Sequence, residues 1–186
     1  MMKTALKLLL ILTVLTGLIY PLVVTGIAQA LFPWRANGSR SYHQGVFTGS
    51  ALIGRNYDKP EYFWGRLSAT SGSPYNPASS SGSNLGPHNP LLHSAMEDRR
   101  AKLLAADPGN TMPIPMDLLT ASASGLDAHI SPEAARYQAP RMARLRGMSL
   151  ERVHQLIDQS TEPRQFGIFG EPVVSVVALN DALDGK

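Results

Sequence analysis

The stretch LLLILTVLTGLIYPLVVTGIAQALF, residues 8–32, contains no charged side chain and decides how the rest of the chain is organised. An apolar helix of about 20 residues is long enough to cross the roughly 30 Å hydrocarbon core of a bilayer. We therefore predict a transmembrane helix over residues 8–32. Lys3 and Lys7 lie before it, so the positive-inside rule places residues 1–7 in the cytoplasm and residues 33–186 on the other side of the membrane.

A cleaved signal peptide is the alternative interpretation of the same stretch. Lys3 and Lys7 fit a basic n-region, and Ala28-Gln29-Ala30 fits a small-x-small cleavage site. The anchor is favoured because the apolar run continues well past Tyr20, where a signal peptide turns polar. Both interpretations export the bulk of the chain.

One side of the predicted span carries residues suited to contact with another helix. Thr13, Gly17, Tyr20 and Ala28 recur at helical spacing, and small residues four apart let helices approach closely in lipid. We expect helix–helix docking on this side. Pro21 predicts a kink near the middle of the helix.

Composition limits what the exported part can be. Two of the 17 Lys and Arg are Lys3 and Lys7, so the rest of the chain carries 15 basic residues against 14 acidic ones. A nearly neutral domain lacks the electrostatic footprint of a nucleic-acid-binding protein. The chain has no cysteine, so we expect packing rather than disulfides to hold one domain together.

Gly and Pro punctuation indicates a mixed α/β fold: one turn-rich domain with a small sheet and several short helices. Cap and breaker residues predict helices over Leu91–Ala106, from Pro132 after Ser131 until Pro140 ends or kinks it, and from Leu150 after Ser149. Apolar runs predict strands over residues 46–53 and 173–179, a last helical turn over 179–183, and an extended edge segment over 112–120.

Residues 61–67, EYFWGRL, concentrate aromatic side chains. One interpretation places Tyr62 and Trp64 in the core with Phe63 covering an edge. The other makes the segment a contact surface, because Trp, Tyr and Arg are enriched in binding hot spots. Residues 68–90 follow as a Ser-, Pro- and Gly-rich stretch whose closely spaced turn residues predict an ordered loop rather than a linker.

No catalytic or metal site is encoded at a recognisable spacing. The five histidines do not stand three or four apart around a carboxylate, so no zincin-type site is predicted. Ser122, Ser124, Asp127 and His129 are the residue types of a hydrolytic triad, but they lie close together without a nucleophile elbow. We expect Asp127 and His129 to hydrogen-bond the loop backbone and cap the helix at Pro132. An accessory or binding role is favoured over catalysis.

Five motifs occur in one order along the chain. They are Tyr62-Phe63-Trp64-Gly65-Arg66, residues 82–87 (GSNLGP) with Asn89-Pro90, residues 119–122 (LTAS) with 124–127 (SGLD), residues 129–132 (HISP) with Ala134-Ala135, and residues 170–172 (GEP). Over nearly its whole length the chain resembles the C subunit of the Kdp-type potassium-transporting ATPase. It departs from that family's pattern at Leu67, Ser81, Ala123 and Ala128, where Pro, Gly, Gly and Pro are usual.

The resemblance implies an accessory subunit of a bacterial inner-membrane complex that takes up potassium at the expense of ATP. Its partners would be a channel-like potassium-translocating subunit, a P-type ATPase subunit and a small stabilising peptide. The family is needed for assembly and is described as a catalytic chaperone that raises ATP affinity. The resemblance also implies a retained anchor, with residues 33–186 in the periplasm. We therefore expect this chain to affect ATP affinity indirectly and to bind no cofactor itself. ATP and potassium would act at the level of the complex.

We further expect the outer domain to pack near the external ion entrance of the channel-like subunit. The candidate partner-facing or motif residues are Tyr62, Phe63, Trp64, Arg66, Ser83, Asn84, Asn89, Asp127 and His129. Two alternatives stay open at this point: a secreted hydrolase that uses Asp127, His129 and a serine after signal cleavage, and a free-standing membrane-anchored scaffold.

Overall fold

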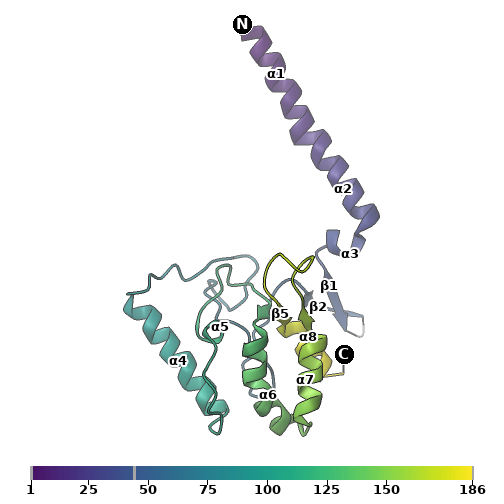
Figure 1. The fold of residues 1–186 in the computed structure, drawn as a ribbon. Coiled ribbons are helices and arrows are strands. Elements are labelled where there is room, and N and C mark those ends of the chain that lie inside the picture. Colours follow the sequence, from purple (N-terminus) through teal and green to yellow (C-terminus); the bar gives the residue numbers. More distant parts are fainter. Residues whose placement is uncertain (1, 44, 186) are drawn as a thin grey trace. The chain divides into compact units, whose positions relative to one another are not determined.

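The computed structural model describes residues 2–43 and 45–185 (Figure 1). Met1, Gln44 and Lys186, which belong to the predicted segments 1–7 and 33–186, lie outside the described residues. The chain divides into two compact units, unit 1 over Met1–Ser50 and unit 2 over Ala51–Lys186.

Unit 1 is dominated by one apolar helix. α1 (Met2–Val14), the π-helical segment η1 (Leu15–Ile19) and α2 (Tyr20–Leu31) follow one another without a break, and none of their side chains is buried. By length and composition this helix, Met2–Leu31, can cross a membrane.

The π-helical segment lies directly before Pro21. Proline has no N–H, and its ring collides with the carbonyl four residues earlier in a regular α-helix. The backbone N–H of Tyr20 bonds the carbonyl of Leu15, five residues earlier, so the helix is locally widened there. Where the sequence predicts a kink, the structure has this π-helical segment, and the helix continues beyond Pro21.

Unit 1 ends in a short helix and a hairpin. α3 (Pro33–Ala36) leads to β1 (Arg40–His43), which pairs antiparallel with β2 (Val46–Ser50), with a register shift between Ser41 and Tyr42. The predicted strand over 46–53 is therefore too long, because a turn begins directly after Ser50.

Unit 2 combines helices with a small sheet, so the predicted mixed α/β class is confirmed. Its helices are α4 (Pro90–Ala106), α5 (Met116–Leu119), α6 (Pro132–Arg146), α7 (Leu150–Gln159) and α8 (Val176–Leu183). Its strands β3 (His129–Ile130), β4 (Thr161–Glu162) and β5 (Val173–Ser175) form an antiparallel sheet in the order β3-β5-β4. α6 and α7 lie side by side (Figure 1).

The caps expected at α6 and α7 are confirmed. The hydroxyl of Ser131 accepts the N–H of Ala134 at 3.0 Å, and that of Ser149 accepts the N–H of Arg152 at 3.1 Å. Gly147 closes α6 in the left-handed conformation. Pro140 does not end α6, because the residues on both sides of it are anchored in the core: Ala139 and Met142 are fully buried.

Two other expectations are wrong. Residues 112–120 contain the helical turn α5 instead of an edge strand, and its Leu118 is fully buried. The strand predicted over 173–179 stops at Ser175, whose hydroxyl caps α8 through the N–H of Ala178 at 3.3 Å. A serine able to cap a helix therefore outweighs the β-propensity of the valines that follow it.

Candidate functional site

The segment Pro60–Arg66, called here the clamped segment, carries the most prominent aromatic motif and pairs with no regular strand. Its backbone is held by side chains from distant elements. The N–H of Phe63 donates to Asn180 Oδ1 at 2.9 Å, and Asn180 Nδ2 donates to the Phe63 carbonyl at 3.0 Å. One amide on α8 thus satisfies both polar groups of a fully buried residue.

Gln138 on α6 repeats this arrangement at the next residue. The Trp64 N–H donates to Gln138 Oε1 at 2.8 Å, and Gln138 Nε2 donates to the Trp64 carbonyl at 3.1 Å. The indole N–H of Trp64 donates to the carbonyl of Lys59 at 2.9 Å. The guanidinium carbons of Arg99 and Arg141 lie 5.0 and 4.6 Å from the centre of the Trp64 ring, within cation–π range.

Arginines and a tyrosine bind the remaining carbonyls of the clamped segment. Arg141 donates to Pro60 and Tyr62, Arg146 donates to Glu61 at 2.9 Å, and Arg99 donates to Gly65 at 2.8 Å. The Tyr75 hydroxyl donates to Arg66 at 2.7 Å. Every carbonyl from Pro60 to Arg66 therefore accepts a hydrogen bond from a side chain, which replaces the ladder of a neighbouring strand.

Arg141 is the most deeply buried of these cations, with 2% of its surface exposed. Burial lowers its pKa to about 10, so the guanidinium stays charged at neutral pH. It also donates to Gln138 Oε1 at 2.6 Å, which orients the amide that binds Trp64. Sequence reasoning missed Gln138, Arg141 and Asn180. The available signal was a polar residue at a core-facing position of an otherwise apolar helix face.

The Asp127 loop, residues 121–129, brings three of the predicted residues together. Asp127 Oδ1 accepts the backbone N–H of His129 at 3.0 Å and lies 3.3 Å from His129 Nδ1, while Asp127 Oδ2 lies 3.4 Å from Arg66 Nη1. His129 Nε2 lies 3.9 Å from Glu162 on β4. The group brings charges of alternating sign together from three segments of the chain, which carry Arg66, the pair Asp127 and His129, and Glu162.

These contacts shift two pKa values. Burial alone would raise the pKa of the Asp127 carboxyl, but the hydrogen bonds and charge of His129, with the charge of Arg66, lower that pKa below its ordinary value. The hydrogen bond to Asp127 raises the pKa of His129 against the opposing effect of burial, and the charges of Asp127 and Glu162 add to the rise. Each shift favours the charged form.

Three segments hold the Asp127 loop through its backbone. The N–H of Gly54 donates to the Leu126 carbonyl at 2.8 Å, and the N–H of Ser81 donates to the Ser124 carbonyl at 2.9 Å. The Ser68 hydroxyl donates to the Gly125 carbonyl at 2.7 Å. A Cβ on Gly82 would lie 2.6 Å from the carbonyl oxygen of Ala123, so glycine is required for this close approach.

The departures at positions 67 and 123 fit this packing. The carbonyl of Leu67 accepts the N–H of Ser122 at 3.0 Å, and this bond needs no particular side chain. Ala123 is not among the residues with positive φ, so an alanine there carries no left-handed strain.

The remaining predicted residues lie apart from the Asp127 group. Ser83 and Asn84 are exposed, and Asn84 adopts a φ of 52° in its loop. Asn89 caps α4 by accepting the N–H of Leu91 at 3.0 Å. Tyr62 is half-buried, with its ring 4.8 Å from the Arg146 guanidinium. Phe63 and Trp64 lie in the core, so the core interpretation holds with Phe63, and not Tyr62, as the second buried ring.

The triad arrangement is not assembled among the described residues. His129 Nδ1 pairs with Asp127, whereas the Ser124 hydroxyl accepts the N–H of Leu126 and the buried Ser122 hydroxyl has no hydrogen-bond partner in residues 2–43 and 45–185. A nucleophile must reach its general base to be activated. Asp127 bonds the loop backbone as expected, but Ser131 caps α6 in its place, and Asp117 accepts the N–H of Ser131 at 2.7 Å. The described residues contain no cluster of metal-ligating side chains.

A cavity of about 670 Å³ adjoins the clamped segment, lined by aromatic rings and cations that include Tyr57, Trp64, Tyr75 and Arg99. Two of its polar side chains already serve the fold: Arg99 binds the carbonyls of Gly65 and Leu118, and Tyr75 binds that of Arg66. Burial raises the pKa of Tyr75 to about 12, so this hydroxyl remains a donor. The part of the cavity wall formed by Arg99 and Tyr75 therefore belongs to the scaffold around residues 60–66.

Comparison with known proteins agrees with the family resemblance that the motifs indicate. A protein from Herpetosiphon aurantiacus, a potassium-transporting ATPase KdpC subunit, is 57% identical over 182 residues, covering 98% of this chain and 94% of its own. Proteins of the same name from Ralstonia nicotianae and Polynucleobacter asymbioticus are 56% and 55% identical over 97% and 100% of this chain, and over 88% and 98% of their own. The family model "KdpC: K+-transporting ATPase, c chain" matches residues 2–185. The chain belongs to the KdpC family, the C chain of the K+-transporting ATPase.

Proposed function

We propose that this chain is the membrane-anchored accessory subunit of an ATP-driven potassium transport complex, with ATP hydrolysis on a partner subunit. The observation that carries the proposal is the extent of the family match, residues 2–185, which includes both the apolar helix and unit 2. A match that begins in the helix supports a retained anchor over a cleaved signal peptide.

The partners we propose are a channel-like potassium-translocating subunit, a P-type ATPase subunit and a small stabilising peptide. The resemblance set out above supports this set, and the relatives' name supports a subunit role in a potassium-transporting ATPase. We place residues 1–7 in the cytoplasm and residues 33–186 in the periplasm of a bacterial inner membrane, following the positive charges at Lys3 and Lys7.

The apolar helix is proposed to pack against helices of these partners. Thr13, Gly17 and Tyr20 are exposed on it, and nothing lies within 4 Å of a Cβ built on Gly17. Ala28 is partly covered. A close approach of another helix at Gly17 is thus sterically open, which supports docking on the predicted side.

A role in assembly and in raising ATP affinity is proposed as an indirect, conformational effect. Backbone polar groups of residues 60–66 and 121–129 are engaged in folding unit 2. A subunit that binds one conformation of its partners more tightly than another shifts those partners toward that conformation. The outer domain is proposed to lie near the external ion entrance, where Tyr62, Arg66, Ser83 and Asn84 offer polar surface.

Purification with a carboxy-terminal tag in mild detergent from potassium-starved cells tests the proposal, with intact mass of the tagged chain as a second readout. We expect two large membrane subunits in fixed ratio and a bait that retains the full 20.1 kDa of the chain plus its tag. A partnerless bait shortened by about thirty residues, as signal cleavage would leave it, would instead indicate a soluble exported protein.

A further inference from the structure

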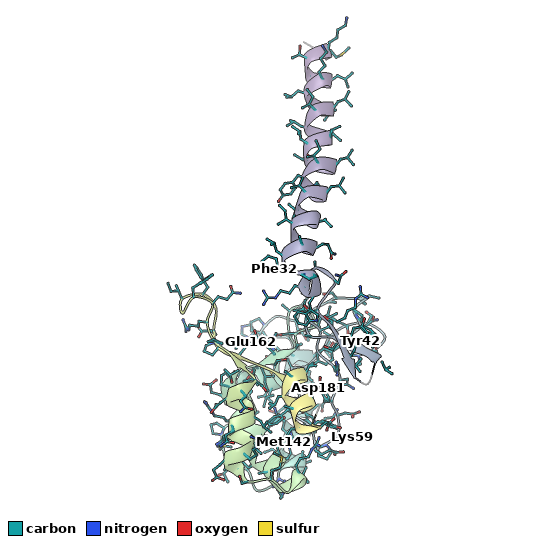
Figure 2. The ribbon with its side chains drawn as sticks, turned by 90° about the vertical axis from the view of Figure 1, so that its right-hand side faces the viewer. Phe32, Tyr42, Lys59, Met142, Glu162 and Asp181 are labelled. Carbon is teal, nitrogen blue, oxygen red and sulfur yellow. The ribbon has the colours of Figure 1, made fainter. Side chains whose placement is uncertain are left out.

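A short turn of unit 2 exposes large apolar side chains. In the apolar turn, residues 166–169, Phe166 is 91% exposed, Ile168 71% and Phe169 65%. The loop that carries it, residues 163–172, follows Glu162 and projects away from the helices of unit 2 (Figure 2). Contiguous exposed apolar groups of this kind mark interaction sites.

The backbone of the apolar turn is preformed. Gln165 and Phe169 exchange two backbone hydrogen bonds, of 2.9 and 3.0 Å, and the N–H of Ile168 donates to Gln165 at 3.1 Å. The hydrogen bond from Ile168 to Gln165 closes a four-residue turn. Its two central residues, Phe166 and Gly167, have φ of 53° and 72°, as in the tight turns that close hairpins.

Phe166 is the unusual member of this turn. A bulky residue rarely adopts positive φ, and asparagine or glycine would relieve the strain. Strained residues cluster at functional sites, where the surrounding structure holds them. The strain here keeps an exposed aromatic ring at the tip, although unit 2 does not use that ring for its own packing.

The charges next to the turn favour one kind of occupant. Arg164 pairs with Glu171 at the base of the loop, and residues 166–169 carry no charge. Attraction to an anionic lipid surface uses unpaired basic residues, which the loop does not supply. A rigid, shaped turn instead lowers the ordering cost of binding to a shaped pocket, an advantage that fluid lipid does not exploit.

We propose that the apolar turn inserts into an uncharged apolar pocket on the extracytoplasmic surface of a partner subunit in the same transport complex. This inference rests on the proposed function, since it requires that the chain assemble with partner subunits. It assigns the contact to residues 166–169, a segment that none of the motifs above includes.

The absence of cysteine from the chain makes a site-specific test direct. Ile168→Cys, labelled on the purified full chain with an environment-sensitive fluorophore, is measured in lipid nanodiscs alone and after reconstitution with the partner subunits. Leu91→Cys, at an exposed apolar position on α4, is the matched control. We expect a blue shift at position 168 only in the assembled complex, with no quenching by spin-labelled lipid.

Two outcomes would overturn the inference. A blue shift in nanodiscs without partners, quenched by spin-labelled lipid, would mean that the turn enters the bilayer. An unchanged spectrum at position 168 in the assembled complex would mean that the turn stays in water. In both cases co-purification of the wild-type chain with its partners still tests the proposed function separately, because a failure of that function appears as a chain without partners.

A triple variant, Phe166→Ser with Ile168→Ser and Phe169→Ser, measures the contribution of the contact. Its side chains are exposed in the free chain, so we expect unchanged folding and about a tenfold or larger fall in retention by the partner subunits. Leu91→Ser is expected to leave retention unchanged. Equal retention of the triple variant and the wild type would contradict the proposal.

Discussion

The clamped segment and the apolar turn both concentrate aromatic side chains, but they differ in the burial of these side chains and in the partners of their backbone groups. In Pro60–Arg66, Phe63 and Trp64 are buried and every carbonyl is bound by a side chain from elsewhere in the unit. In residues 166–169 the rings are in water and the backbone bonds are local. The difference separates aromatic residues that fold the domain from those available to bind something else.

The largest expected effect compares one phenylalanine from each region. Phe63→Ala empties a fully buried site and should lower the free energy of unfolding by about 3–5 kcal/mol. Phe166→Ala should change it by no more than about 0.5 kcal/mol, because that ring is exposed. Urea denaturation of the full chain in mild detergent, followed by fluorescence in a Trp34→Phe background, measures both. Similar losses from the two variants would contradict the comparison.

The next effect tests the clamp itself. Gln138→Ala leaves the N–H and carbonyl of Trp64, and one Arg141 donor, without their partner, so we expect a loss of about 2–4 kcal/mol in the free energy of unfolding. Gln155→Ala on α7 is the control, since Gln155 is exposed and its side chain accepts a hydrogen bond from Arg152 on the same helix. A loss at Gln138 no larger than at Gln155 would show that the clamp contributes nothing.

A smaller effect of opposite sign is expected at the apolar turn. Phe166→Asn keeps the positive φ with a residue that tolerates it and should raise the free energy of unfolding by up to about 1 kcal/mol. The same denaturation experiment detects the change. A clear destabilisation would mean that the Phe166 ring already packs within unit 2.

The smallest effect concerns the Asp127 group. The raised pKa of His129 means that its charged pair with Asp127 stabilises the fold fully below pH 6.5 and loses that contribution as the pH rises through the folded-state pKa. An NMR titration of the His129 ring should give a midpoint above 6.5, and Asp127→Asn should move it back down. A wild-type midpoint at or below 6.5 would show that His129 and Asp127 do not form a stabilising charged pair.

Local features were predictable from the sequence, and long-range ones were not. An uninterrupted apolar run predicts the helix over residues 8–32, and Ser131 and Ser149 predict the starts of α6 and α7, because these signals act within a few residues. The clamp joins Trp64 to Gln138 across 74 positions and Phe63 to Asn180 across 117, and no local pattern encodes such pairs.

The same limit applies to exposure. The apolar and aromatic composition of residues 62–64 and of residues 166–169 fits either a buried core segment or an exposed interface. Composition alone does not distinguish the two. The enrichment of Trp, Tyr and Arg in binding hot spots supported a contact surface at residues 61–67 beside the core interpretation, and the rings of Phe63 and Trp64 are buried. The joining of Arg66, Asp127 and His129 was predictable only for the neighbouring pair, since Arg66 comes from a segment 61 residues away.

Hydroxyl-radical footprinting of the chain alone and of the assembled complex reads both regions in one experiment. We expect Phe63 and Trp64 to resist oxidation in both samples, whereas Phe166, Ile168 and Phe169 are oxidised in the free chain and protected in the complex. Oxidation of residues 166–169 to the same extent in both samples, or protection of Phe63 and Trp64 only after assembly, would contradict the assignment of folding to the clamped segment and of docking to the apolar turn.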